Sequence, residues 1–217
     1  MNFDTPLGGW FTYITWNIDL STRGPLVRAS ARRGDYAHRL VSLAKQLREE
    51  GATTAHALGV TVIVPVKGGP KYDLALLVHA AGPTLDELIQ RTSDLGFPAP
   101  ELAMTARNGG RFGDTEGQSG EILLNHFAGE TSSENAVEAW KSVSEWYARA
   151  LSVDNSTLLE FTPGAPFLIM NYAVLPGRTL PFLAGQLLRP SFYSVVRTQL
   201  HDVGIEPFPL IARRLGA

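Results

Sequence analysis

The sequence predicts an α+β fold made of two tandem βαββα repeats, whose two antiparallel sheets pack into one body with the helices outside. Three observations support this prediction. Strand-length segments alternate apolar and polar residues, segments with apolar residues at helical spacing lie between them, and a turn rich in glycine and proline occurs at the same point of each half. With 217 residues, of which 44% are hydrophobic, the chain can bury a large core.

The first half of the chain contains the elements of one repeat. Residues 12–20 alternate in polarity, so that Ile14, Trp16 and Ile18 share one face of a strand. We expect the following helix to begin at Asp35 and to bury a stripe of leucines. The remaining elements expected here are a strand at 53–66, a hairpin turn at 67–71, a strand at 72–80 and a helix that opens with a capping box at 84–87.

The second half repeats this order of elements. A strand at 121–128 precedes a helix that opens with the capping box Thr131-Ser132-Ser133-Glu134. The elements expected after it are a strand at 156–161, a turn at 163–166, a strand at 167–174 and a helical region from Thr179, broken at Pro190, to about Val203. The same order in both halves favours internal duplication.

The segment between the halves, residues 105–120, contains five glycines and several polar residues. It is either a flexible linker or a mobile flap over a pocket, because long loops inside compact domains are often functional. The sequence therefore predicts a first repeat at 1–104, this glycine-rich segment at 105–120 and a second repeat at 121–217.

The composition excludes several classes of function. The chain contains no cysteine, so disulfides, thiolate nucleophiles and cysteine-based zinc sites are ruled out. A formal charge of -2 gives no basic surface of the kind that nucleic acids need. No segment reaches the roughly 20 apolar residues that span a bilayer, and the first residues lack the pattern of a secretory signal. We therefore expect a cytoplasmic protein with no nucleic-acid or membrane partner.

Polar residues on the strand faces that the helices leave uncovered are candidates for a binding site. Asn17 and Asn125 occupy matching places in the first strands of the two halves. Tyr13, Thr15 and Asp19 share the strand face of Asn17 and are expected to bind substrate.

A histidine and a tyrosine take matching places in the third strands. Aligning residues 75–80 with 168–173 sets His79 opposite Tyr172, and both would face a shared cavity as proton-transfer groups. Alternatively, His79 lies at a strand end and bonds a backbone carbonyl. Glu160 is a further candidate for a substrate contact, either as a buried general base or as a carboxylate at a solvent-facing edge.

Other prominent side chains are expected to pack in the core. His126 follows Asn125 in its strand, so it should point to the opposite, helix-covered face. Trp140, Trp146 and Tyr147 fall at helical spacing and look like core residues rather than a cofactor site.

The order of elements resembles that of the dimeric α/β-barrel superfamily, whose unit is a ferredoxin-like β-α-β-β-α-β fold. The resemblance covers nearly the whole chain and is carried by residues 14–20, 73–79, 122–127 and 167–172 and by the Gly68-Gly69-Pro70 turn. It implies two ferredoxin-like repeats fused in tandem and packed as an α/β barrel. Members of this superfamily include cofactor-free monooxygenases and polyketide cyclases, and also haem enzymes such as chlorite-dismutase-like and dye-decolourising peroxidases.

The resemblance and the residues together imply a small-molecule enzyme with an apolar cavity. The first hypothesis is a cofactor-independent cyclase or monooxygenase acting on an aromatic or polyketide-like substrate, with His79, Tyr172, Asn17 and Asn125 as catalytic groups. The alternatives are a haem-binding oxidoreductase of the same superfamily, with a histidine as axial ligand, and a non-catalytic small-ligand-binding protein.

Motifs of other enzyme classes are missing. The chain has no zinc-protease motif, Walker A motif, nucleophile elbow or strand-linked dinucleotide-binding motif, so we expect no metal site. Fusion of two repeats can satisfy the sheet pairing within one chain. We therefore expect a monomer or a homodimer.

Overall fold

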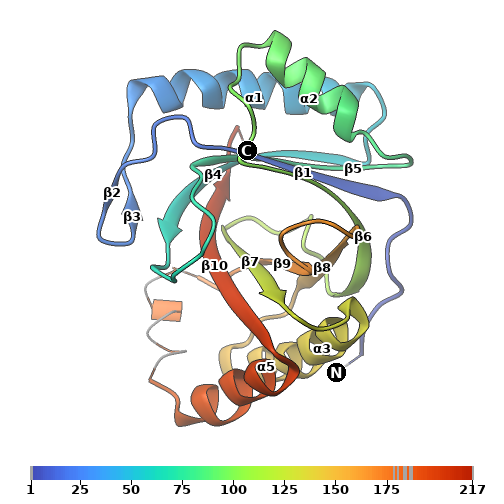
Figure 1. The fold of residues 1–217 in the computed structure, drawn as a ribbon, viewed down its shortest axis with the longest axis vertical. Coiled ribbons are helices and arrows are strands. Elements are labelled where there is room, and N and C mark those ends of the chain that lie inside the picture. Colours follow the sequence, from blue (N-terminus) through green and yellow to red (C-terminus); the bar gives the residue numbers. More distant parts are fainter. Residues whose placement is uncertain (1, 178, 180, 183–184, 186–187, 217) are drawn as a thin grey trace. The chain divides into compact units, whose positions relative to one another are not determined.

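The computed structural model describes residues 2–177, 179, 181–182, 185 and 188–216 (Figure 1). The chain divides into two compact units. The N-terminal unit comprises Gly8–Arg107 and Leu210–Ala217, and the C-terminal unit comprises Met1–Leu7 and Asn108–Pro209. Within the described part of the chain, every helix is too short or too polar to cross a membrane.

An antiparallel sheet forms the centre of the N-terminal unit. Its strands are β1 (Trp10–Trp16), β4 (Thr54–Ile63), β5 (Leu74–Ala80) and the first part of β6 (Leu102–Phe112), in the order β6-β1-β5-β4. On the central strand β1, Ile14 lies opposite Leu76 of β5 and Ala103 of β6. A short hairpin of β2 (Thr22–Arg23) and β3 (Leu26–Val27) pairs with β4, as do the last residues of β10 (Ile205–Arg214).

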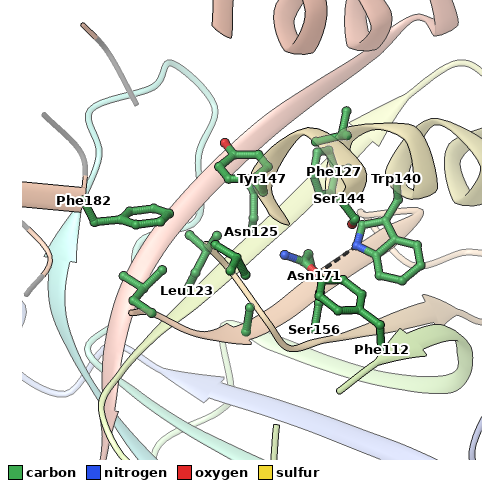
Figure 2. Close-up of a pocket in the computed structure, with 14 residues that line it drawn as sticks. Phe112, Leu123, Asn125, Phe127, Trp140, Ser144, Tyr147, Ser156, Asn171 and Phe182 are labelled. Carbon is green, nitrogen blue, oxygen red and sulfur yellow. Dashed lines mark hydrogen bonds between the residues drawn. The ribbon is translucent and has the colours of Figure 1, made fainter. Parts of the chain in front are cut away.

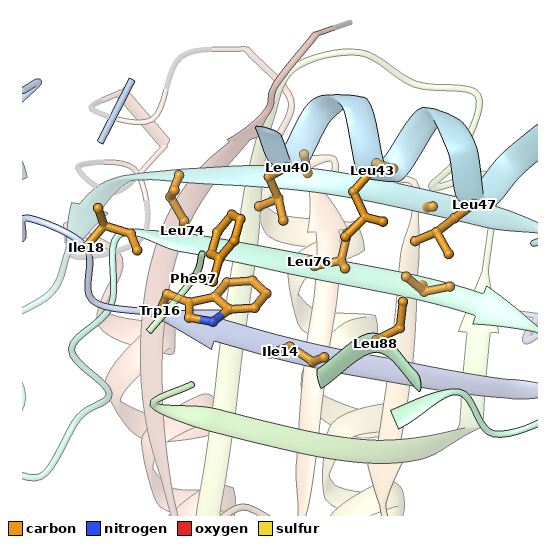
Figure 3. Close-up of a cluster of buried hydrophobic side chains, with 14 residues drawn as sticks. Ile14, Trp16, Ile18, Leu40, Leu43, Leu47, Leu74, Leu76, Leu88 and Phe97 are labelled. Carbon is orange, nitrogen blue, oxygen red and sulfur yellow. The ribbon is translucent and has the colours of Figure 1, made fainter. Parts of the chain in front are cut away.

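Two helices, α1 (Ala31–Glu49) and α2 (Leu85–Asp94), cover one face of this sheet (Figures 1 and 3). The face of β1 predicted to be apolar is the face that the helices cover. Full burial of one leucine side chain stabilises the fold by about 2 kcal/mol, so this layer is a main source of stability. The larger members of the core are Ile14, Trp16, Ile18, Leu40, Leu43, Leu47, Leu74, Leu76, Leu88 and Phe97.

Both long helices begin at a serine that the sequence analysis did not select. The side chain of Ser30 accepts a hydrogen bond from the backbone N–H of Arg33 (3.2 Å), so α1 starts well before Asp35. The apolar stripe used for the prediction starts later than the helix, because the first turn of α1 is polar. In the second half, Ser132 caps the helix in place of Thr131 and accepts from the backbone N–H of Asn135.

The C-terminal unit contains a second antiparallel sheet. Its strands β7 (Glu121–Gly129), β8 (Ser156–Phe161) and β9 (Ile169–Val174) lie with parts of β6 and β10 in the order β10-β7-β9-β8-β6. In this register, Asn125 of β7 lies opposite Asn171 of β9. The helices are α3 (Ser133–Leu151), the π-helix η1 (Phe192–Arg197) and α5 (Thr198–Val203). The predicted helical region from Thr179 falls partly outside the described residues.

The two halves of the chain have the same strand order. In each half, the first strand lies between the last and the third, giving β6-β1-β5-β4 and β10-β7-β9-β8. The order of elements in each half is therefore βαββαβ and not the predicted βαββα. The last strand of each half, β6 or β10, was not predicted. Such a match is what tandem duplication predicts. The duplication itself and its boundaries stay predictions.

Strand β6 corrects the interpretation of residues 105–120 as a linker or flap. Residues 105–112 belong to β6, where alternate side chains are buried, and the loop is confined to residues 113–120. The prediction of a linker or flap rests on the glycines, but Gly110 is a packing position. A Cβ atom at Gly110 would lie 2.7 Å from Cζ3 of Trp140, which is closer than packed atoms approach.

We expect Gly110→Ala to lower the melting temperature by several degrees, because overpacking costs about 1–3 kcal/mol. Gly109→Ala is the matched control. A Cβ atom at Gly109 would have ordinary contacts at 3.4 Å, so this change should be close to neutral. Differential scanning calorimetry of both variants is the measurement. Equal melting temperatures for the two variants would contradict the assignment of Gly110 as a packing position.

Candidate functional site

A cavity lies between α3 and the sheet of the C-terminal unit (Figure 2). Its volume is about 30 Å³, which holds water but is too small for an aromatic ring. Its wall is largely apolar, and its aromatic members are Phe112, Phe127, Trp140, Tyr147 and Phe182. Besides the hydroxyl of Tyr147, the polar groups of the lining residues are few and uncharged: Asn125, Ser144, Ser156 and Asn171. An apolar wall with a few polar groups is the usual composition of a small-molecule pocket.

Alternation along β7 determines which side chains reach this cavity. Leu123, Asn125 and Phe127 point to the α3 side, as their place in the cavity wall shows. His126 therefore points to the other face, where its ring lies 4.9 Å from that of Phe167. Asn125 was predicted to point away from the helix and His126 towards it, and both predictions are wrong. Alternation shows which residues share a strand face, but it does not show which of the two faces the helix covers.

His126 has a packing role on that face, as the sequence analysis expected. It is completely buried, and burial lowers its pKa to about 3 despite a hydrogen bond with the backbone of Phe208. The ring is therefore neutral at physiological pH.

Asn171 is held in place by two donors inside the cavity wall. Its Oδ1 accepts a hydrogen bond from Nε1 of Trp140 (2.9 Å), drawn in Figure 2, and another from the hydroxyl of Ser156. Asn171 and Ser156 were not predicted as site residues, and Trp140 was predicted to be a core residue. The available signal was an amide at position 171 in an otherwise apolar strand.

Asn125 lies directly across from Asn171 but is bonded differently. Its Oδ1 is buried, and no group in the described part of the chain donates a hydrogen bond to it. A buried acceptor without a donor costs stability, and in native proteins it usually has a functional or structural explanation. The wall of the cavity thus presents one acceptor that is ready for a donor.

Tyr147 and Phe182 form the aromatic end of the cavity. Their rings are stacked, with centroids 6.3 Å apart and planes inclined by 15°. Burial raises the pKa of Tyr147, so its hydroxyl stays protonated near neutral pH. It can donate a hydrogen bond but cannot act as a base there.

Two predicted site residues, Tyr13 and Thr15, lie on the face of β1 that the helices do not cover. Tyr13 is fully buried, its hydroxyl is hydrogen-bonded to that of Tyr72, and burial raises its pKa. Thr15 is fully buried too, and its hydroxyl has no partner within the described residues. Their role as substrate contacts stays a prediction.

Asn17 and Asp19 are not in that face, contrary to the sequence analysis. β1 ends at Trp16, and both residues are exposed in the turn that follows. The turn forms because the carboxylate of Asp73 accepts hydrogen bonds from the backbone N–H groups of Ile18 and Asp19, both at 3.0 Å. Asn17 and Asn125 are therefore not in equivalent places.

His79 is buried near the end of β5. Its Nε2 lies 2.6 Å from the backbone oxygen of Gly8, and its ring stacks on Phe11 with centroids 4.2 Å apart. These contacts agree with the alternative hypothesis, in which His79 lies at a strand end and bonds a backbone carbonyl. Its catalytic role stays a prediction.

Tyr172 and Glu160 lie in the C-terminal unit, whereas His79 lies in the N-terminal unit. Tyr172 is fully buried on β9, on the face opposite the cavity. Glu160 is half-buried on β8, with its Cβ close to Gly109. A cavity shared by His79 and Tyr172 stays a prediction.

Comparison with known proteins identifies the fold. No protein-family model matches the chain, and no curated protein matches it in sequence. Among solved structures, it is similar to a protein from Lactobacillus acidophilus NCFM named as a candidate monooxygenase, with a TM-score of 0.57, 9% identity and coverage of 95% of this chain and 94% of that one.

Two further structures are similar over nearly the whole chain. An anthrone oxidase-like protein gives a TM-score of 0.55 at 9% identity, covering 96% of this chain and 93% of that one. A novel haem-binding protein from Thermus thermophilus gives 0.51 at 12% identity, covering 97% and 92%. The chain therefore has the α+β fold of the dimeric α/β-barrel proteins, as its sequence predicted. The similar structures thus include proteins named as a candidate monooxygenase, as anthrone oxidase-like and as haem-binding.

The two facing asparagines should respond differently to truncation. We expect Asn171→Ala to cost about 1–3 kcal/mol, because the indole N–H of Trp140 and the hydroxyl of Ser156 lose their acceptor. Asn125→Ala, the matched control, should cost much less, since its Oδ1 has no donor among the described residues. Urea denaturation gives the two free energies of unfolding. A larger loss for Asn125→Ala would refute this account of the cavity wall.

Proposed function

We propose that this protein is a small-molecule enzyme that binds an aromatic, hydroxyl-bearing substrate in the cavity beneath α3. The observation that carries the proposal is Oδ1 of Asn125, a buried acceptor in an aromatic wall. A phenolic hydroxyl is a donor attached to an apolar ring, so it satisfies both features of the cavity at once.

The size of the cavity requires one side chain to move when a ring binds. Phe182 is suited to this, because its ring lies parallel to that of Tyr147 and lines the cavity. A substrate ring that takes the place of Phe182 would stack on Tyr147 in the same way. In this proposal, Phe182 occupies the position of the substrate ring when no substrate is bound.

The proposed chemistry is cofactor-independent monooxygenase or cyclase activity on an aromatic or polyketide-like substrate. The names of two structural neighbours, a candidate monooxygenase and an anthrone oxidase-like protein, support this class. Asn125 would position the substrate hydroxyl, which would donate a hydrogen bond to its Oδ1. His79 and Tyr172 do not line this cavity, so a proton-transfer role for them is proposed separately from binding beneath α3. We further propose a cytoplasmic monomer or homodimer.

The haem alternative does not fit the residues of this cavity. An axial ligand needs a histidine nitrogen directed into the haem site, and none of the residues that line the cavity is a histidine. The ring of His79 is stacked on Phe11 and bonded to Gly8, and that of His126 is packed against Phe167. The proposed chemistry therefore does not use haem. A Soret band after haem supplementation would contradict this proposal. A non-catalytic binding protein would instead bind aromatic compounds without turning them over.

The binding proposal is tested with 2-naphthol and naphthalene, which share a ring system and differ in the hydroxyl. We expect the protein to bind 2-naphthol at least roughly tenfold more tightly, because only this ring donates to Asn125. Asn125→Ala should remove the preference while keeping the fold. Fluorescence titration gives both affinities. Equal affinities for the two rings in the unsubstituted protein would sink the proposal.

A second variant keeps this test informative if the cavity opens rarely. Phe182→Ala removes the ring that occupies the proposed substrate position, so it should increase the affinity for both naphthyl probes. Leu188→Ala is the control, because Leu188 is 82% exposed and does not line the cavity. If Phe182→Ala binds neither ring, the cavity is not the aromatic site.

The proton-transfer role of His79 can be separated from its packing role. We expect His79→Ala to lower the melting temperature, because a buried ring that stacks on Phe11 is removed. His79→Gln keeps a side-chain donor for Gly8 with little change in volume, so it should recover part of the stability. A catalytic histidine would leave this variant inactive on a substrate that the protein turns over. Full activity of His79→Gln would show that the residue is structural.

A further inference from the structure

A second cavity lies in the N-terminal unit, at the point where the start of α1 meets the end of β10. Its volume is about 120 Å³, four times that of the cavity beneath α3. The residues that define it are Ser30, Arg33 and Gly34 of the first turn of α1 and its cap, Leu74 of β5, and Arg213 and Leu215 at the end of the chain. Charged and apolar side chains thus share one wall.

Two guanidinium groups from distant parts of the sequence converge on this cavity. Arg33 belongs to α1, and Arg213 belongs to β10, where it pairs with Gly59 of β4. Burial lowers the pKa of Arg33, the charge of Asp73 opposes this shift, and the charge of Arg213 adds to it. Arginine stays protonated in proteins, so the cavity holds two like charges.

Neutral groups hold Arg33 in place without cancelling its charge. Its Nη2 donates to the backbone oxygens of Val60 (2.6 Å) and Asp73 (3.1 Å). The carboxylate of Asp73 is already engaged by two backbone N–H groups. In the part of the chain that the structure describes, no carboxylate forms an ion pair with Arg33 or Arg213.

Gly59 lets the guanidinium of Arg33 lie against the sheet. A Cβ atom at Gly59 would lie 3.3 Å from Nη2 of Arg33 and 3.0 Å from Cδ2 of Leu215. The start of α1 adds to the positive field, since its first turn contains no acidic residue. Two arginines that line one cavity, one of them fixed by backbone carbonyls, and that form no ion pair with a carboxylate among the described residues have the composition of an anion site.

We propose that this cavity binds a doubly charged, tetrahedral oxyanion of the size of phosphate. Two guanidinium groups and the helix start favour two negative charges over the single charge of a carboxylate. The volume accommodates inorganic phosphate or the phosphate group of a small ester. The site is independent of the cavity beneath α3 and of the function proposed for it.

The test uses inorganic phosphate at a slightly alkaline pH, where it is largely a dianion. Isothermal titration at constant ionic strength should show saturable binding to the intact protein. Arg213→Gln should weaken this binding by at least roughly tenfold, because one charge-assisted contact is lost. Arg213 is exposed, so the variant keeps the fold. Arg23→Gln, which removes an exposed charge outside the cavity, should bind as the unsubstituted protein does.

Three outcomes would overturn the proposal. The first is an absence of saturable phosphate binding to the intact protein. The second is an equal loss in Arg213→Gln and Arg23→Gln, which would mean that net charge alone attracts the anion. The third is acetate binding as tightly as phosphate, which would assign the cavity to a carboxylate. If Arg33→Gln folds, as circular dichroism would show, it should lose phosphate binding together with Arg213→Gln.

Discussion

In each sheet of this protein, helices cover one face, and the strict alternation of strand side chains decides which residues meet them. Ile14 and Trp16 meet α1 and α2 and build the core, whereas Tyr13 and Thr15, which alternate with them along β1, point away. On β7 the same rule sends Asn125 under α3. A shift of one residue in either strand would exchange core and candidate site, so the alternation links the stability of the fold to the chemistry of its cavities.

The pattern of residues along each strand also explains which strands could be predicted from the sequence. Strands such as β4 and β5 carry long apolar or alternating runs, and their positions were predicted within a few residues. β6 was missed because its adjacent glycines, Gly109 and Gly110, imitate a loop. β10 was missed because Pro207 and Pro209 are normally strand breakers. In both strands the neighbouring elements impose the extended conformation, and this long-range effect is invisible in local composition.

The candidate site was harder to predict than the fold, for a physical reason. Asn125 was selected as a polar residue in an apolar strand, but its face was assigned by analogy with Asn17. The two residues differ because Asp73 binds the backbone after Trp16 and ends β1 early, whereas β7 continues past Asn125. A single carboxylate far away in the sequence therefore decides that Asn17 is a turn residue. No spacing rule contains that information.

Polar groups beneath α3 also show how a small apolar cavity can keep its shape. Oδ1 of Asn171 accepts hydrogen bonds from Trp140 and Ser156. The bond with Trp140 fixes the indole that packs over Gly110. Because those groups are satisfied, they have little tendency to bind anything else. Asn125 differs in that its buried Oδ1 has no donor within the described residues. The wall thus combines a satisfied half with one acceptor that has no donor among the described residues. In the proposed function, this contrast would give a donor-bearing ring a preferred orientation.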